Sequence, residues 1–417
     1  GLPDGLSYDL VVDPTNVDIL YTSLVFSNGA NGLYKSSDGG ASWAKVSTAA
    51  VDAFINNNVS NLEMAVGQHN NVYVGIVQFG APVAFYRSGD GGATWTQLDD
   101  PVTFENTGDV GLNPKGSKGP TAGDNPTPAQ IAGGQGSIHF SIVADPTDPN
   151  IVYVGGDRQP RSNQDNGNFP NSIGARDFTG RLFRGDASLA AGAQWVHLTH
   201  RNDLGAAGGG TASSSAPHAD SREMTFDANG NLLEVDDGGV YRRTDPRTNQ
   251  GDWFAMTGDL QITEAHDVAY DSVSNTLMTG NQDTGTTYQP GEDASTWVSL
   301  STADGGDVVI DDKSLAAGGQ SIRYSSFQNL GAFRRTVWDA AGNLVSTSFP
   351  ALTGFSGGVF RTPVELNSVD PTRLAIQGAA ATFETLNSGN TATSLNAAPN
   401  GNFYQNALAY GGSKNGT

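Results

Sequence analysis

The side chains in this sequence that could do chemistry are carboxylates, histidines and arginines next to short apolar runs. His139 precedes one such run, Asp157 follows another, and Asp220 precedes a third. A set of His, Asp and Arg side chains that converge in a concave, partly dry place is the usual form of a ligand-binding site. The candidate ligand-binding residues are therefore His139, Asp157, Arg158, His218, Asp220, Arg222, Asp236, His266, Asp283 and Asp307.

The residue types exclude some reactions and leave others open. Cysteine is absent, so cysteine chemistry is excluded, and no His-Glu-x-x-His zinc motif occurs. A polysaccharide lyase would use a His and a Tyr as its acid and base. The candidates are His139, His218, His266 and Tyr241, and their spacing singles out none of them. Calcium binding is possible, because Gly/Asp/Asn turns offer hard oxygen ligands, but no Asp-x-Asp-x-Asp-Gly loop identifies the metal ligands.

The composition narrows the partners and the fold. The 417 residues include 43 Asp and Glu against 22 Lys and Arg, a formal net charge of −21. Binding to nucleic acid is excluded on this ground, because phosphate contacts need clustered Lys and Arg. No apolar stretch of about 18 residues is present, so no membrane span is expected. Short Val/Ile/Leu/Tyr runs between Gly/Asp/Asn clusters predict strands and tight turns.

Two repeated boxes show how these strands are organised. The boxes are 52 residues apart from Asp38 to Asp90, a spacing near that of propeller blades. Their role is structural: the Asp side chain is expected to accept the backbone N–H two residues on, and the Gly pair supplies positive φ. The Trp is expected on the fourth strand, between neighbouring sheets. The box residues are Ser36, Asp38, Gly39, Gly40 and Trp43, and Ser88, Asp90, Gly91, Gly92 and Trp95.

Alignment of the recurring strand and turn phrases divides the chain into seven units of four short strands. One such sheet cannot bury both faces, whereas several arranged radially can, so we predict an all-β fold, a β-propeller with seven recognisable four-stranded blades. In this topology the starts of the inner strands and the loops between strands two and three share one end, opposite the boxes. The predicted blades are approximately 6–50, 60–100, 136–200, 218–258, 264–302, 305–348 and 359–396.

The two boxes resemble the Asp-box, or bacterial neuraminidase repeat, of sialidases, sortilin-type receptors and xyloglucanases. Later phrases resemble a broader family of exported bacterial repeat proteins, namely His218-Ala219-Asp220, Asp237-Gly238-Gly239-Val240-Tyr241-Arg242, Gly280-Asn281-Gln282-Asp283-Thr284-Gly285-Thr286 and Gly305-Gly306-Asp307. The resemblance covers most of the chain and implies a propeller, but many activities occur in this family. The segment around Asp236 resembles the xyloglucanase segment with one catalytic Asp, so Asp236 joins His218 and Tyr241 as a catalytic candidate. The tandem propeller that carries the partner acid is missing here.

We expect residues 1–417 to form a single propeller, with 397–417 as a closing strand or the start of a further blade. Both ends resemble interrupted units, which favours a larger polypeptide and an assembly of eight or more blades. Long insertions at 101–135 and 155–180 are expected to be functional or disordered, and the Gly/Ala/Ser-rich segment 201–217 to be mobile.

The expected function is an exported or cell-surface recognition module that binds a glycan or an extracellular protein at the propeller mouth and long loops. The first alternative is a carbohydrate-active enzyme, a glycoside hydrolase or polysaccharide lyase, that uses the mouth carboxylates and histidines. The second is a structural component of a surface layer or adhesin. The sequence leaves open whether the chain is an enzyme.

Overall fold

The computed structural model describes residues 1–105, 108–114, 134–160, 170–176, 178–258, 263–395 and 408–411. In these ranges the chain forms seven four-stranded antiparallel sheets and one two-stranded sheet. Its helices are short: α1 (Ala49–Asp52) and the 3-10 turns η1 (Ala316–Gly318) and η2 (Gln328–Leu330). None of the described helices is long and apolar enough to cross a membrane.

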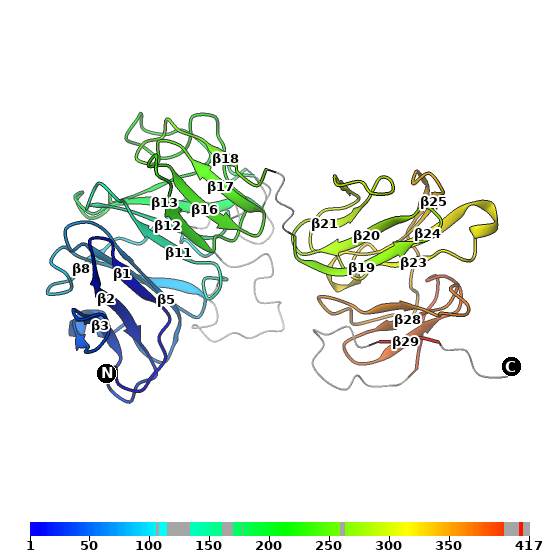
Figure 1. The fold of residues 1–417 in the computed structure, drawn as a ribbon, viewed down its shortest axis with the longest axis horizontal. Helices are drawn as coiled ribbons and strands as arrows, with labels where there is room; N and C mark the ends of the chain where they lie inside the picture. Colours follow the sequence, from blue (N-terminus) through cyan, green and yellow to red (C-terminus); the bar gives the residue numbers. More distant parts are fainter. Residues whose placement is uncertain are drawn as a thin grey trace. The chain divides into compact units, whose positions relative to one another are not determined.

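The chain divides into two compact units, Gly1–Leu260 and Gln261–Thr417, each of which is described by itself. The first unit contains four of the four-stranded sheets (Figure 1). Their strands are β1 (Leu10–Asp13), β2 (Asn16–Leu24), β3 (Gly32–Ser36) and β4 (Ala44–Lys45); β5 (Val59–Val66), β6 (Val72–Gln78), β7 (Ala81–Ser88) and β8 (Thr96–Leu98); β11 (Ser141–Ala144), β12 (Ile151–Arg158), β13 (Gly180–Asp186) and β14 (Trp195–His197); and β15 (Glu223–Phe226), β16 (Leu232–Asp236), β17 (Gly239–Arg243) and β18 (Trp253–Ala255).

The second unit contains the other three four-stranded sheets. Their strands are β19 (Ala265–Asp271), β20 (Thr276–Asn281), β21 (Gly285–Tyr288) and β22 (Val298–Ser299); β23 (Val309–Asp311), β24 (Gln320–Ser325), β25 (Arg334–Asp339) and β26 (Leu344–Ser348); and β27 (Val364–Leu366), β28 (Leu374–Gln377), β29 (Thr382–Thr385) and β30 (Thr393–Ser394).

Within each unit the sheets meet along their first strands. β5 contacts β1 and β11, β11 also contacts β15, and in the second unit β23 contacts β19 and β27. Each sheet follows chain order from this inner strand outward, which is the blade pattern of a β-propeller. The prediction of an all-β propeller fold with seven four-stranded blades is confirmed, whereas a single domain over residues 1–417 stays a prediction.

Apolar side chains fill the space between neighbouring blades. Leu62, Val74 and Ile76 of the second blade are fully buried and pack in one cluster with Tyr21 and Leu33 of the first. β6 is buried over almost its whole length. A strand covered on both faces is expected to be continuously apolar rather than alternating, and its sequence VYVGIVQ has this character.

Acidic side chains at the equivalent position of three inner strands, four residues before the turn that ends the strand, join each strand to the next inner strand by a hydrogen bond. The Oδ2 atom of Asp9 accepts the N–H of Met64 at 2.7 Å, that of Asp267 accepts Val308 N–H at 3.0 Å, and that of Asp307 accepts Val364 N–H at 3.0 Å. Each bond crosses from one blade to the next. This bond gives Asp307, a predicted ligand-binding residue, a structural role between blades six and seven.

In each Asp-box turn, the Asp side chain bonds a backbone N–H that lies further along the sequence than we predicted. Asp90 Oδ1 accepts the N–H of Thr94, four residues on, at 2.8 Å, and Ser88 Oγ accepts Gly92 N–H at 2.7 Å. The expectation of a bond to the residue two positions on was wrong, because the Ser side chain already caps that part of the turn. Trp95 precedes the fourth strand and donates Nε1–H to Val46 O of the previous blade at 2.9 Å.

The seventh blade keeps this hydrogen-bond pattern with different side chains. Asn387 Oδ1 accepts Thr391 N–H at 2.9 Å, and Thr385 Oγ1 accepts Gly389 N–H at 2.9 Å. Thr and Asn therefore replace the Ser and Asp of the boxes, at the same spacing. The absence of the Asp conceals this turn in the sequence, although the hydrogen bonds of the turn are kept.

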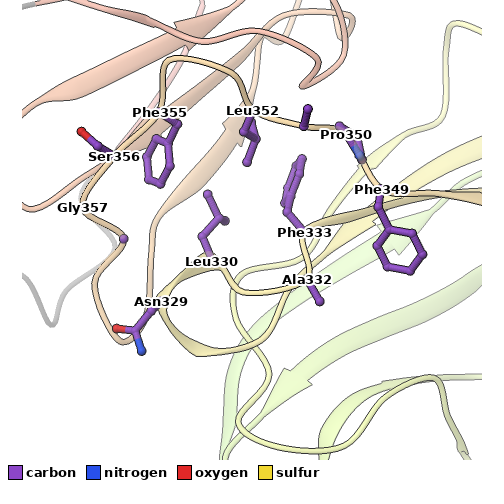
Figure 2. Close-up of a pocket in the computed structure, with 12 residues that line it drawn as sticks. Asn329, Leu330, Ala332, Phe333, Phe349, Pro350, Leu352, Phe355, Ser356 and Gly357 are labelled. Carbon is purple, nitrogen blue, oxygen red and sulfur yellow. The ribbon is translucent and has the colours of Figure 1, made fainter.

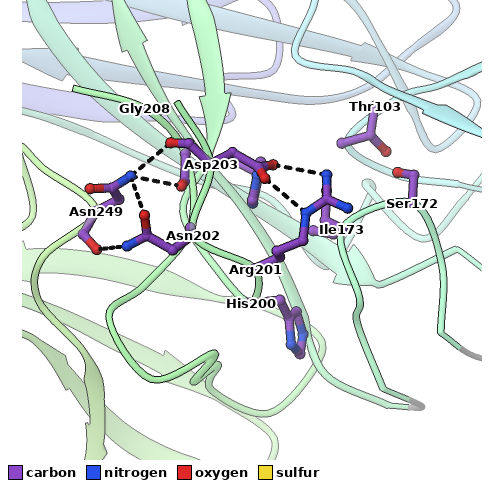
Figure 3. Close-up of polar contacts among 12 residues, drawn as sticks. Thr103, Ser172, Ile173, His200, Arg201, Asn202, Asp203, Gly208 and Asn249 are labelled. Atoms are coloured by element: carbon purple, nitrogen blue, oxygen red, sulfur yellow. Dashed lines mark hydrogen bonds and ion pairs between the residues drawn. The ribbon is translucent and has the colours of Figure 1, made fainter. Parts of the chain in front are cut away.

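Two of the insertions are built onto the first unit. Strands β9 (Thr103–Glu105) and β10 (Gly108–Val110) form a hairpin, and the fully buried Arg181 donates to Gly111 O at 2.7 Å and to Thr103 Oγ1 at 3.0 Å. Segment 201–217, expected to be mobile, is held by hydrogen bonds: Asn249 Nδ2 donates to Asn202 Oδ1 at 2.9 Å, and Asp203 pairs with Arg201 at 2.8 Å (Figure 3).

The C-terminal segment 397–417 lies outside the described residues except for 408–411. This short piece is not a strand. Ser368 N–H donates to Tyr410 O at 3.1 Å, and the Tyr410 hydroxyl donates to Glu384. The described part of the predicted closing strand therefore contacts the seventh blade.

Candidate functional site

Three predicted residues from distant parts of the sequence meet at one end of the first unit. His139 Nδ1 lies 3.1 Å from Asp220 Oδ1 and 3.6 Å from Asp157 Oδ1. His139 and Asp220 precede inner strands β11 and β15, and Asp157 lies near the end of β12. The expectation that inner-strand starts share an end with the loops after the second strands holds for these residues.

A short turn fixes His139. Its N–H donates to Gln135 O at 2.8 Å, and Gly136 N–H donates to Gly80 O of the second blade at 2.9 Å. Gly134 passes so close to Asp157 that a Cβ at this position would lie 2.5 Å from Asp157 Oδ2. A larger residue at 134 would therefore push the carboxylate away from the histidine.

Hydrogen bonds orient the Asp157 carboxylate, and the backbone conformation positions Asp220. Asp157 Oδ1 accepts Asn113 Nδ2–H at 2.8 Å, and Asp157 Oδ2 accepts Gln135 N–H at 2.8 Å. Asp220 has a φ of +74°, an uncommon conformation that Asp tolerates better than most residues. The next residue is tied to the third blade by Ser221 N–H donating to Gly156 O at 2.9 Å.

The electrostatics of this cluster favour a charged histidine. Burial alone would lower the pKa of His139, but the carboxylates of Asp157 and Asp220 outweigh this effect and raise that pKa to about 9. Burial raises the pKa of Asp157, against the opposing effect of His139. When no other ligand is bound, the group behaves as an ion-paired triad between the third and fourth blades.

The catalytic candidates surround Gly238 in the fourth blade. Asp236 Oδ1 accepts Gly238 N–H at 2.8 Å, and a Cβ at Gly238 would lie 2.5 Å from His218 Cβ and 3.0 Å from the Tyr241 hydroxyl. Burial raises the pKa of Asp236 to about 7, and burial with the charge of Asp236 raises that of Tyr241 to about 12. A carboxyl with a pKa near neutral can donate or accept a proton at physiological pH.

Glu234 adds an acid that the sequence reasoning missed. It stands two residues before Asp236 on β16, so both side chains lie on one face of the strand. Glu234 is fully buried, and neither of its carboxylate oxygens has a hydrogen-bond partner. Burial and the neighbouring Asp236 hold the pKa of Glu234 well above its ordinary value.

The other predicted ligand-binding residues of the first unit are Arg222, which forms an ion pair, and Arg158, which lies over an aromatic ring. Arg222 Nη2 lies 2.8 Å from Asp237 Oδ1, with the arginine side chain half exposed. The guanidinium of Arg158 lies 5.5 Å from the ring centroid of Phe178. Guanidinium groups can donate hydrogen bonds to a hydroxyl-rich ligand.

Exposed apolar side chains lie beside these polar groups. Phe79, Ile138 and Phe178 are 42%, 56% and 51% exposed, and they belong to the loop between β6 and β7, the His139 turn and the residues before β13. Phe79 and Phe178 have φ values of +51° and +53°. Positive φ is a strained conformation for a bulky side chain and often marks a binding site. The sequence reasoning missed them, as it missed Asn113 and Gln135.

The other predicted residues, His266, Asp283 and Asp307, belong to the second unit. His266 makes hydrogen bonds through both ring nitrogens, Nδ1 to Gly305 O at 2.7 Å and Nε2 to Gln282 Oε1 at 2.9 Å. Asp283 donates its N–H to Asp304 Oδ1 at 3.1 Å from a φ of +56°.

The second unit also has an apolar pocket of about 490 Å³. Figure 2 shows the side chains of Leu330, Phe333, Leu352 and Phe355 gathered around it. No ionisable side chain lines this pocket. It offers no acid or base, whereas His139, Asp157 and Asp220 meet in the first unit.

Comparison with known proteins gives no family assignment. No family model matches the chain, and no curated protein is similar to it in sequence. Among solved structures, an ancestral GH74 enzyme is 15% identical with a TM-score of 0.32, over 93% of this chain and 44% of that enzyme, so the chain spans less than half of it. YCF48 from Cyanidioschyzon merolae is 11% identical with a TM-score of 0.32, over 92% of this chain and 93% of that protein. The BP39L lectin from Burkholderia pseudomallei is 12% identical with a TM-score of 0.28, over 92% and 97%. At these TM-scores the similarities carry no argument about the site.

Proposed function

We propose that the chain is a recognition module of the Asp-box propeller type, exported or displayed at the cell surface, that binds a glycan or an extracellular protein at the mouth of the first unit. The observation that carries the proposal is the strained, exposed ring of Phe178, which lies 5.5 Å from the Arg158 guanidinium; Phe79, on the loop between β6 and β7, is a second exposed ring with positive φ. Aromatic rings next to hydrogen-bonding groups are a common way to hold sugars and protein side chains. The acidic surface suits a soluble exported protein and disfavours polyanionic partners.

A glycan screen tests this proposal most directly. The chain is applied to an array of neutral and cationic glycans, with and without calcium, and hits are measured by calorimetry. Phe178→Ala should weaken binding at least tenfold, since stacking and burial of one aromatic side chain contribute about 1.5–3 kcal/mol. Phe254→Ala removes an exposed ring from β18 and serves as the matched control. A Phe178→Ala chain that binds every hit as the unaltered chain does would overturn the proposal.

The enzyme alternative rests on the raised pKa of Asp236 beside His218 and Tyr241. A carbohydrate-active enzyme could use Asp236 as a general acid, with a second group to complete hydrolysis or elimination. Incubation of the same chain with polysaccharides and analysis of the products separates this alternative from pure binding. Products that disappear in Asp236→Asn would establish an enzyme, and binding without products would support the recognition role.

A further inference from the structure

We propose that His139, Asp157 and Asp220 bind a divalent first-row metal ion of the zinc or manganese class. The three side chains come from separate segments, and their Nδ1 and carboxylate oxygens all lie within 4.8 Å of one another. This inference goes beyond the recognition role and does not depend on it, since a metal can bind whether or not a glycan does.

The contacts in this cluster have the spacing of ligands around an ion. Metal bonds of about 2.0–2.2 Å place neighbouring ligand atoms about 3.0–3.5 Å apart. The His139 nitrogen lies 3.1 Å and 3.6 Å from the two carboxylate oxygens. Both atoms are buried, and neither His139 Nδ1 nor Asp220 Oδ1 has a hydrogen-bond partner. A metal ion that displaces the proton from His139 Nδ1 would therefore meet three donor atoms close enough to bind it together.

The surroundings hold the ligands as metal sites usually require. Asn113 and the backbone of Gln135 donate to the two oxygens of Asp157, and each oxygen keeps a second lone pair for a metal. Gly134 allows the chain to approach Asp157, and the turn bond of His139 N–H to Gln135 O fixes the backbone from which the imidazole extends. These contacts are the outer hydrogen bonds that orient ligands before the ion arrives.

The donor set selects the kind of metal. Calcium prefers six to eight oxygen ligands, whereas an imidazole nitrogen suits zinc, manganese and their neighbours. Three protein ligands leave positions for water or for a ligand held at the mouth. The competing explanation is an ion-paired triad that only joins blades three and four, and it predicts no metal affinity.

The test measures metal binding directly. The chain is stripped with a chelator and titrated in separate calorimetry runs with ZnCl₂, MnCl₂ and CaCl₂, and bound metal is counted after gel filtration. One zinc or manganese ion per chain is expected, with binding weakened about tenfold or more in His139→Ala and in Asp220→Asn. His69→Ala and Asp109→Asn, which change exposed side chains, should bind as the unaltered chain does.

Loss of folding in a variant is separated from loss of ligation by circular dichroism and by a measurement on the unaltered chain. Electron paramagnetic resonance of bound Cu²⁺ should show coupling to one imidazole nitrogen. Three results would overturn the proposal. The first is no saturable binding below about 100 µM, which is in the weak range for a specific site. The others are tighter binding of calcium than of zinc and manganese, and unchanged metal affinity in folded His139→Ala.

Discussion

Replacement of Glu63 by Gln is expected to stabilise the first unit in a pH-dependent manner. Glu63 lies on β5, where burial and then the charges of Asp9 and Glu223 raise its pKa from 4.5 to about 9. Asp9 and Glu223 stand at the same position of their own inner strands, four residues before the turn residues Asp13 and Asp227. Repetition of the blade therefore brings like charges together at the inner strands.

The direction in which Glu63 changes the stability follows from its pKa in the unfolded chain, 4.5, and in the folded chain, about 9. Below pH 4.5 the carboxyl of Glu63 is protonated in both the folded and the unfolded chain, so it has no effect on stability. Between pH 4.5 and about 9 only the unfolded chain ionises, and the folded state loses stability as the pH rises. At about 1.4 kcal/mol per pH unit, the interval from 4.5 to 7 gives an upper limit of about 3.4 kcal/mol, and solvent near the carboxyl reduces this to about 1–2 kcal/mol.

Urea unfolding of the unaltered and Glu63→Gln chains at pH 4, 7 and 9 checks this expectation. The two midpoints should coincide at pH 4, and the variant should unfold at higher urea at pH 7 and still higher at pH 9. Glu292→Gln, which removes an exposed carboxyl, controls for net charge and should show no such trend. A difference that is constant with pH, or a variant that is less stable at pH 7, would refute the reasoning.

Three further outcomes are expected. Asp90→Ala should lower the melting temperature by about 2–4 °C, because the box loses the bonds to Thr94 and Ser88, while glycan binding stays unchanged; a folded variant without binding would contradict this. Asp271→Asn should cost about 3–5 kcal/mol in urea unfolding because it leaves the buried Arg323 guanidinium unpaired, and a loss below 1 kcal/mol would count against it. The rate of any polysaccharide cleavage that needs protonated Asp236 should fall as the pH rises through about 7. A cleavage rate that does not change between pH 5 and 9 would exclude Asp236 as the acid.

The repeated boxes and strand phrases made the blades predictable, because the side-chain chemistry of a turn recurs wherever the turn recurs. The same topology brought His139, Asp157 and Asp220 together as expected. The supporting contacts were not predictable: Asn113 reaches the site from the insertion at 101–135, which has no repeat to align with. Backbone strain at Phe178 was equally hidden, because a bulky residue gives no sequence signal for positive φ.

The position four residues before the turn helps to separate structural acids from functional ones. It is Asp9, Glu63 and Glu223 in blades one, two and four of the first unit, where Asp9 joins two inner strands. In the third blade this position is Ser141, whose hydroxyl bonds Ser221 of the fourth blade at 2.8 Å. His139 stands two residues earlier, on the same face of the extended chain. The third blade thus has a neutral serine–serine bond where the other blades have a carboxylate. It also has a histidine two residues earlier, where the other inner strands of the first unit have Ser7, Asn61 and Ser221. Repetition of the blade explains the other acids and does not explain this histidine, whereas the proposed metal site does.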